Sequence, residues 1–104
     1  MVNVLLKQSN SETITVSTTA IGFTGATAAG AVLAVCSVED ADIRVDCSNT
    51  PTSSKGIRIK NGQQFRVWGE SDILGFKAIR DASTNATLQV LYYTVGEVYP
   101  WDIK

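Results

Sequence analysis

The chain has 104 residues, of which 44% are apolar and 18% are charged, with a net charge of −1 and no histidine. This length suits one domain, residues 1–104, that buries a core without metals or disulfides. Because acidic and basic residues are interspersed, the chain lacks the basic footprint of a protein that binds nucleic acid or an anionic membrane surface.

The N-terminal residues 1–11 contain only a short apolar patch. The patch is shorter than the apolar core of a signal peptide and far shorter than the roughly 20 residues of a membrane-spanning helix. We therefore expect a protein made in a cytoplasm, with no membrane partner. Residues 12–18 alternate in polarity, with Ile14 and Val16 on one face, which predicts the first strand.

Residues 20–30 contain three glycines, which disfavour a stable helix and predict a loop. We expect Ile21 and Phe23 to place the apolar side of this loop on the core. Residues 31–38 are apolar on both faces, which indicates a central strand that is covered on both sides. A short buried helix is the alternative for the same segment.

Residues 41–47 form the clearest half-buried strand, because inward and outward residues alternate along it (Ile43, Val45 and Cys47 inward; Asp42, Arg44 and Asp46 outward). If this strand formed a hairpin with residues 31–38, Cys36 and Cys47 would lie diagonally, with Cβ atoms about 7–8 Å apart. A disulfide needs about 3.5–4.5 Å. We therefore expect two buried free thiols.

Residues 48–56 have the composition of a loop, and residues 57–60 that of a short strand. The pair Asn61-Gly62 predicts a hairpin to a strand at residues 63–68, because both positions tolerate positive φ. Alternation along this strand directs Phe65 and Val67 inward and Trp68 outward. The outward Trp68 either covers a loop or marks a contact surface.

Residues 69–72 predict a turn, and residues 73–80 a strand with Leu74, Phe76 and Ala78 on one face and a bulge at Gly75. Residues 87–95 predict a long closing strand. Large apolar residues lie on both of its faces, so it is either sandwiched or partly exposed to a partner. The apolar tail, residues 96–104, either folds back on the domain or docks on a neighbour.

About seven short strands, separated by turns every eight to twelve residues, are typical of an all-β fold. We predict a single antiparallel β-sandwich or partly open barrel. Residues 1–11 and 96–104 are predicted to be extended contact arms of this domain.

No catalytic constellation, cofactor motif or metal cluster is visible in the sequence. Without histidine, the commonest general base and metal ligand is absent. The acidic residues around Asp40 fail the calcium-loop template, because Val45 and Pro51 occupy the positions that need glycine and glutamate. We therefore expect no catalytic, cofactor-binding or metal-binding residues, no bound cofactor and no enzymatic activity.

Five short segments in order resemble a family of small structural proteins of tailed-phage virions, over about half of the chain: DIRV (42–45), NTPTSSKGI (49–57), KNGQQF (60–65), FKAIR (76–80) and ATLQVLYY (86–93). Such families tend to have Asp-Gly after the first of these strands, where this chain has Asp46-Cys47. The resemblance implies a β-sandwich subunit of a virion, such as a capsid decoration (cement) protein.

The first functional hypothesis is thus a decoration protein that stabilises a phage capsid through contacts with the major capsid protein or other virion proteins, and that self-associates. The alternatives are a tail, head–tail connector or fibre-attachment component, and a carbohydrate- or receptor-binding module. The residues that we expect to make protein contacts are apolar or aromatic and lie near the two ends or face outward: Val2, Val4, Leu5, Leu6, Trp68, Tyr99 and Trp101.

Overall fold

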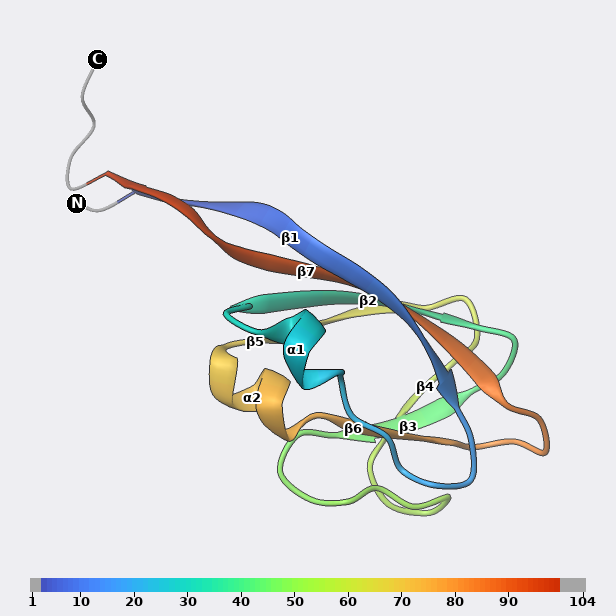
Figure 1. Ribbon diagram of the computed structural model, residues 1–104. Helices are drawn as coiled ribbons and strands as arrows, with labels where there is room; N and C mark the ends of the chain where they lie inside the picture. Colours follow the sequence, from blue (N-terminus) through green and yellow to red (C-terminus); the bar gives the residue numbers. More distant parts are fainter. Residues whose placement is uncertain (1–2, 100–104) are drawn as a thin grey trace.

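The computed structural model describes residues 3–99 of the chain, and side chains from residue 5 to residue 96. The elements follow in the order β1 (Asn3–Val16), α1 (Gly25–Ala28), β2 (Leu33–Glu39), β3 (Ile43–Asp46), β4 (Ile57–Ile59), β5 (Gln64–Trp68), α2 (Glu70–Gly75), β6 (Lys77–Arg80) and β7 (Ala86–Tyr99). The strands form two antiparallel sheets, in the orders β1-β7-β2-β5 and β4-β3-β6 (Figure 1). The prediction of an all-β, sandwich-like fold is confirmed. Neither of these helices is long and apolar enough to cross a membrane.

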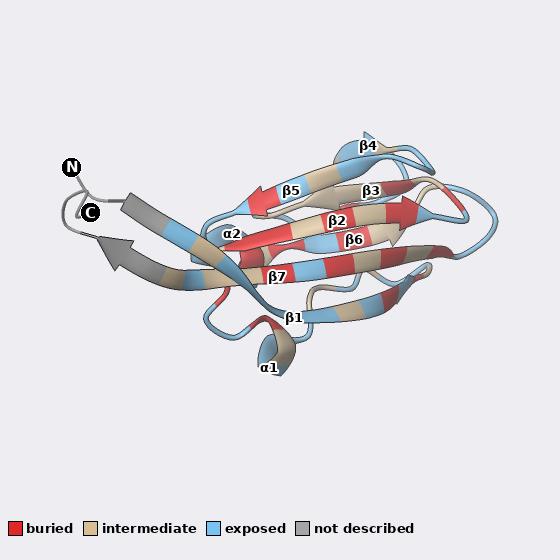
Figure 2. Cartoon of the chain, turned by 90° about the horizontal axis from the view of Figure 1, so that it is seen from above, coloured by how far each residue is buried: buried red, intermediate tan, exposed pale blue. Residues whose placement is uncertain are grey.

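The core lies between the two sheets, and the buried residues follow the alternation of the strands (Figure 2). Ile14 and Val16 of β1 face this core, as their spacing predicts. The inner residues of β7 and β2 join them (Leu88, Val90 and Tyr92; Ala34, Cys36 and Val38). Ile43 and Phe76 close the core from the side of the three-stranded sheet.

Aromatic rings from distant segments meet in this core. Phe23 stacks on Phe76, with ring centroids 4.2 Å apart, and meets Tyr92 edge-on at 5.4 Å. The inward placement of Phe23 is therefore confirmed, whereas Ile21 is 40% exposed and lies at the surface, where its backbone bridges to Ala78. The loop at residues 20–30 also contains the short helix α1, which ends before Gly30.

The predicted strand at residues 31–38 is confirmed as β2, but its hairpin with residues 43–47 is wrong. β2 pairs with β5 and β7, while β3 belongs to the other sheet. A strand that is apolar on both faces gains most from a central position, where neighbours on both edges satisfy its backbone. Both thiols are free, as expected, but only Cys36 is buried, whereas Cys47 is half-buried.

The Asn61-Gly62 hairpin is also wrong, although the chain does turn there. The N–H of Gln63 donates to the carbonyl of Lys60 at 3.0 Å, and Gly62 has a φ of 91°. The flanking strands then separate, because β4 joins β3 and β5 joins β2. The Gly62 N–H donates to the carbonyl of Val38, so the turn is held by the four-stranded sheet.

Only the second half of the strand predicted at residues 73–80 exists. Helix α2 continues to Gly75, which buries Ile73 and leaves Leu74 75% exposed, opposite to the predicted strand faces. Phe76 and Ala78 are buried as expected. Gly75 is not a bulge: a Cβ there would lie 2.1 Å from the carbonyl oxygen of Cys47, so the end of this helix packs against the backbone after β3.

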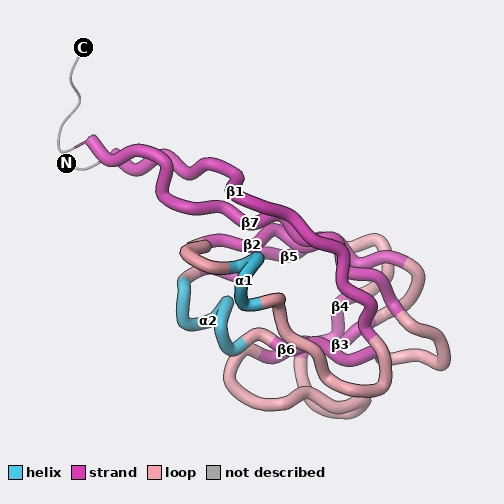
Figure 3. The backbone as a smooth tube through the Cα atoms, viewed as in Figure 1, coloured by secondary structure: helices cyan, strands magenta, loops and turns pink. Residues whose placement is uncertain are grey.

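Strands β1 and β7 extend beyond the two-sheet body as a two-stranded ribbon (Figures 1 and 3). They pair from Val16 with Ala86 to Asn3 with Tyr99, whereas β2 accompanies β7 only as far as Tyr93. The projecting residues 94–99 correspond to roughly 20 Å at about 3.3 Å per residue. The molecule accordingly measures 55 × 23 × 22 Å.

Candidate functional site

The outer face of the four-stranded sheet divides into an apolar end and a polar end. Residues opposite one another in an antiparallel register share a face. The row nearest the ribbon contains Trp68, Leu33 and Tyr93, and the next row contains Arg66, Val35 and Leu91. The third row is polar throughout (Gln64, Ser37 and Gln89).

The apolar end is exposed although its residues are large. Trp68 is 60% exposed and Leu91 is 38% exposed, while Val35 and Tyr93 are half-buried. Leu33 is buried on this otherwise open face because it is flanked by Trp68 and Tyr93. The outward orientation predicted for Trp68 is confirmed, and its backbone pairs with Leu33 of β2.

The same face continues onto the ribbon. Alternation along β7 places Val95 on the side of Leu91 and Tyr93, and Val95 is 45% exposed and pairs with Leu6. We call this surface the contact face, and it comprises Leu6, Leu33, Val35, Trp68, Leu91, Tyr93 and Val95. Exposed apolar residues that adjoin in this way mark interaction sites more often than scattered single ones.

The predicted contact residues are only partly placed on this face. Trp68 and Leu6 belong to it, and Leu5, 52% exposed, is the neighbour of Leu6 on the ribbon. In the backbone, Val4 pairs with Val98 and Asn3 with Tyr99, near the ribbon's tip. Val2 and Trp101 lie outside the described residues.

Sequence reasoning missed Leu33, Val35, Leu91, Tyr93 and Val95 as members of the contact face. For Leu91, Tyr93 and Val95 a signal was present, since large residues on both faces of residues 87–95 already indicated a strand that a partner could cover. Leu74 was missed as an exposed residue because its helix was predicted to be a strand.

The polar end of the outer face satisfies its own hydrogen bonds. Thr13 donates its hydroxyl hydrogen to Gln89 Oε1 at 2.7 Å, and Gln89 Nε2 donates to Glu39 at 3.4 Å. The Thr87 hydroxyl donates to Asp40 at 2.6 Å. This is the ordinary arrangement of a solvated antiparallel face, and it contrasts with the apolar end a few residues away.

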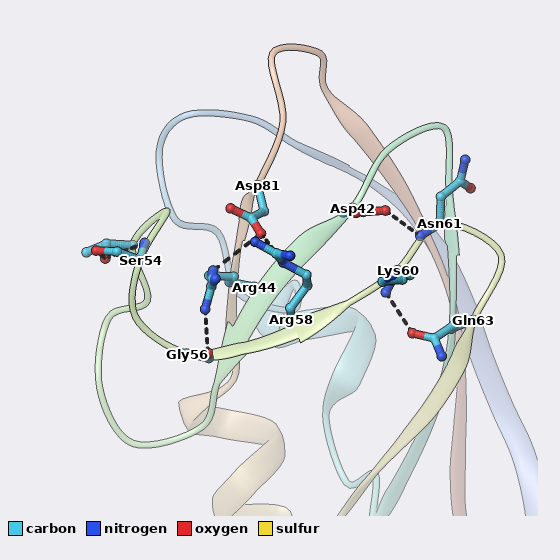
Figure 4. A network of polar contacts seen from close by, with 10 residues as sticks. Asp42, Arg44, Ser54, Gly56, Arg58, Lys60, Asn61, Gln63 and Asp81 are labelled. Atoms are coloured by element: carbon cyan, nitrogen blue, oxygen red, sulfur yellow. Dashed lines mark hydrogen bonds and ion pairs between the residues drawn. The ribbon is translucent and has the colours of Figure 1, made fainter.

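A second cluster of polar residues holds the three-stranded sheet to the loop after β6 (Figure 4). Asp81, whose side chain is 7% exposed, accepts Arg58 Nε at 2.6 Å and lies 3.3 Å from Arg44 Nε. Arg44 also donates through Nη1 to the carbonyl of Gly56. A pocket of about 560 Å³ adjoins Asp81, lined also by Thr18, Thr52, Ser53, Ile79, Arg80 and Ala82. The arginines neutralise the carboxylate that this pocket contains, which is typical of a structural ion-pair cluster.

Two of the acidic residues that suggested a calcium loop accept hydrogen bonds from backbone N–H groups. Asp46 accepts the N–H groups of Ser48 and Asn49, and these bonds lower the pKa of its carboxyl group. Asp42 accepts the N–H of Asn61. Over the part of the chain that the structure describes, no group of three or more potential ligands could hold a metal ion.

Two ionisable groups are buried in the core and have raised pKa values. Burial, and then the hydrogen bond that it donates to Glu12, raise the pKa of the Tyr92 hydroxyl above its ordinary value. Burial, and then the nearby Cys47, raise the pKa of the Cys36 thiol to about 12. Both groups are therefore neutral at physiological pH, and a neutral thiol is a poor nucleophile.

Comparisons of the chain with protein-family models, curated proteins and solved structures found no match.

Proposed function

We propose that this protein is a structural component of a tailed-phage virion, a capsid decoration protein that binds the assembled shell through its contact face. The observation that carries the proposal is the exposed apolar end of the outer sheet face, continued by the ribbon. The ordered resemblance of residues 42–93 to small virion proteins supports the same class of function. The partner is the major capsid protein or another virion protein.

The contact face has the composition of a protein interface. Trp68 and Tyr93 are of the residue types that most often dominate binding energy, and the aliphatic Val35 and Leu91 lie beside them. On a symmetric shell, each copy meets an equivalent site, so that modest contacts repeat over many positions. A protein that works in this way stabilises the shell by burying area and needs no reaction.

Binding to undecorated capsids tests this function directly. Purified protein is mixed with capsids that lack it, and the bound fraction is measured by co-sedimentation for the wild type and for Trp68→Ala. Loss of about 2 kcal/mol at an interface anchor would weaken the affinity per site roughly 30-fold. The matched control is Gln64→Ala, at the polar end of the same strand, which should bind like the wild type.

Two results would oppose the proposal. The first is that the wild type fails to bind capsids and is absent from purified virions by mass spectrometry. The second is equal binding by the wild type and Trp68→Ala. Rings or tubes formed by the isolated protein would instead favour the tail or connector alternative, and glycan binding lost in Trp68→Ala would favour the carbohydrate-binding alternative.

A further inference from the structure

One edge of the ribbon is open where β2 ends. The last hydrogen bond to β7 on this side runs from the N–H of Val32, the residue before β2, to the carbonyl of Tyr93, at 2.9 Å. Backbone groups alternate in direction along a strand, so those of Thr94 point to β1 and those of Val95 point away from it. Among the described residues, no strand pairs with this second edge of β7 over residues 94–99.

We propose that this open edge pairs with the same edge of a second copy, so that two chains form a dimer about a two-fold axis. The ribbons would lie antiparallel, in the strand order β1-β7-β7-β1 across the two copies. A strand added to a sheet edge binds mainly through main-chain hydrogen bonds. This dimer deepens the proposed function, because it identifies one partner of a decoration protein as the protein itself.

A second copy fits this edge because the edge is complementary to itself. Each chain offers the same six residues, so the pairing uses the open groups of both copies over one matched length. Antiparallel strands related by a two-fold axis satisfy the isologous rule of symmetric dimers. Where the pairing ends, β2 of each copy would lie in line with β7 of the other.

The charges on the ribbon permit this approach. Residues 3–10 and 94–99 contain one basic and one acidic residue, Lys7 and Glu97, so two ribbons bring no net charge together. Natural proteins usually protect a free edge with lysines, prolines or short strands. β7 from Thr94 to Tyr99 contains no lysine or proline, and one bulge, at Gly96, lies within it.

Each strand of the ribbon has one extra residue. In β1 the register shifts between Gln8 and Asn10, so that Ser9 is extra, opposite the end of β2 and outside the projecting part. Such bulges twist and interrupt an edge. β7 also has an extra residue, Gly96, where a Cβ would lie 3.2 Å from the carbonyl oxygen of Leu5. A glycine at this position lets β7 bend while keeping its pairing with β1.

Pairing about this axis would also place the two contact faces on the same side. Antiparallel neighbours in one sheet share their faces, so Trp68 of both copies would point in one direction. A dimer would then present two adhesive faces to one shell, and the second attachment would follow the first at a high effective concentration.

The experiment compares four proteins by sedimentation velocity over a range of concentrations. The wild type should form dimers. Val95→Pro removes an N–H that alternation directs to the open edge and should be monomeric, whereas Val95→Thr keeps that group in a β-branched residue and should dimerise like the wild type. Trp68→Ala should lose capsid binding and remain dimeric, which separates failure of this proposal from failure of the proposed function.

Amide hydrogen exchange in the wild type gives a second measurement that needs no variant. The Val95 N–H should be protected in concentrated solution and should exchange faster on dilution, in step with dissociation. A wild type that stays monomeric, a closed trimer, dimerisation by a folded Val95→Pro or fast exchange at Val95 in the dimer would each overturn the proposal.

Discussion

The buried hydroxyl of Tyr92 should stabilise the fold by a measurable amount that disappears at alkaline pH. Tyr92 is fully buried, and its hydroxyl donates to the carboxylate of Glu12. Glu12 also accepts two hydrogen bonds from Thr24, one from the backbone N–H at 3.1 Å and one from the hydroxyl group at 2.6 Å. The three residues therefore connect β1, β7 and the start of α1. The substitution Tyr92→Phe removes one donor and leaves the other two in place.

The expected cost follows from the charge of the acceptor. A hydrogen bond to a charged group contributes about 1.5–3 kcal/mol. Because Glu12 is half-buried and keeps both bonds from Thr24, we expect the lower value, about 1.5 kcal/mol at pH 7. For a domain of this size, that corresponds to a decrease in Tm of roughly 6–12 °C.

The pH dependence provides a sharper test. Tyrosine in an unfolded chain ionises near pH 10, whereas burial and the bond to Glu12 keep Tyr92 protonated in the folded state. Its stabilisation is therefore complete below about pH 10 and is lost above it, by about 1.4 kcal/mol per pH unit. The stabilities of the wild type and Tyr92→Phe should converge near pH 11, by this reasoning roughly one unit above the tyrosine pKa.

Urea denaturation of both proteins at pH 7 and from pH 9 to pH 11.5 measures this difference. Other tyrosines and the thiols are common to both proteins, so their ionisation largely cancels. The reasoning is refuted if Tyr92→Phe is as stable as the wild type at pH 7. It is equally refuted if the difference persists unchanged at pH 11.

Three further substitutions test other parts of the fold. Burial raises the pKa of Cys36 in the folded protein, so the free energy of unfolding should fall as the pH rises from 9 toward 12. Cys36→Val lacks this thiol. In urea titrations, its loss of stability between pH 9 and pH 10 should therefore be smaller than that of the wild type by up to about 1.4 kcal/mol. Gly75→Ala would place a Cβ 2.1 Å from the carbonyl oxygen of Cys47 and should lower the stability of the fold by about 3 kcal/mol, measured by thermal denaturation. The control is Gly25→Ala, which has open space around the added Cβ and should not destabilise the fold. Asp81→Asn should cost about 2–3 kcal/mol, because Arg44, with a side chain only 18% exposed, loses its counter-ion; an unchanged urea midpoint would contradict this role.

Local patterns in the sequence predicted which residues face the core, but not which strands are neighbours. Alternation correctly identified Ile43, Phe65 and Val67 as inward-facing, because a period of two has a direct physical meaning on a pleated strand. The same strands were paired wrongly in two places. A turn such as Asn61-Gly62 reverses the chain equally well within one sheet or between two, and only the available edges of β2 and β3 decide between these outcomes.

The contact face was predictable only in part for a related reason. Trp68 is conspicuous because it interrupts an otherwise polar outward set of residues. Leu91 and Val95 become part of a surface only once β2 lies beside β7 and β5 beside β2, since exposure depends on neighbours that the sequence does not specify. Leu74 shows the same limit, because a strand and a short helix place it on different sides.

Strand β7 separates buried from exposed apolar residues along a single segment. Its inner residues Leu88, Val90 and Tyr92 are buried in the core, and its outer residues Leu91 and Val95 remain exposed. Substitutions of the inner set should therefore destabilise the fold, whereas polar substitutions of the outer set should change stability by no more than about 0.5 kcal/mol. Leu91→Ser tests this separation: it should unfold in urea like the wild type and bind capsids more weakly. Weaker binding accompanied by an equally large loss of stability would mean that the outer residues support the fold, and that the exposed apolar end has no separate role.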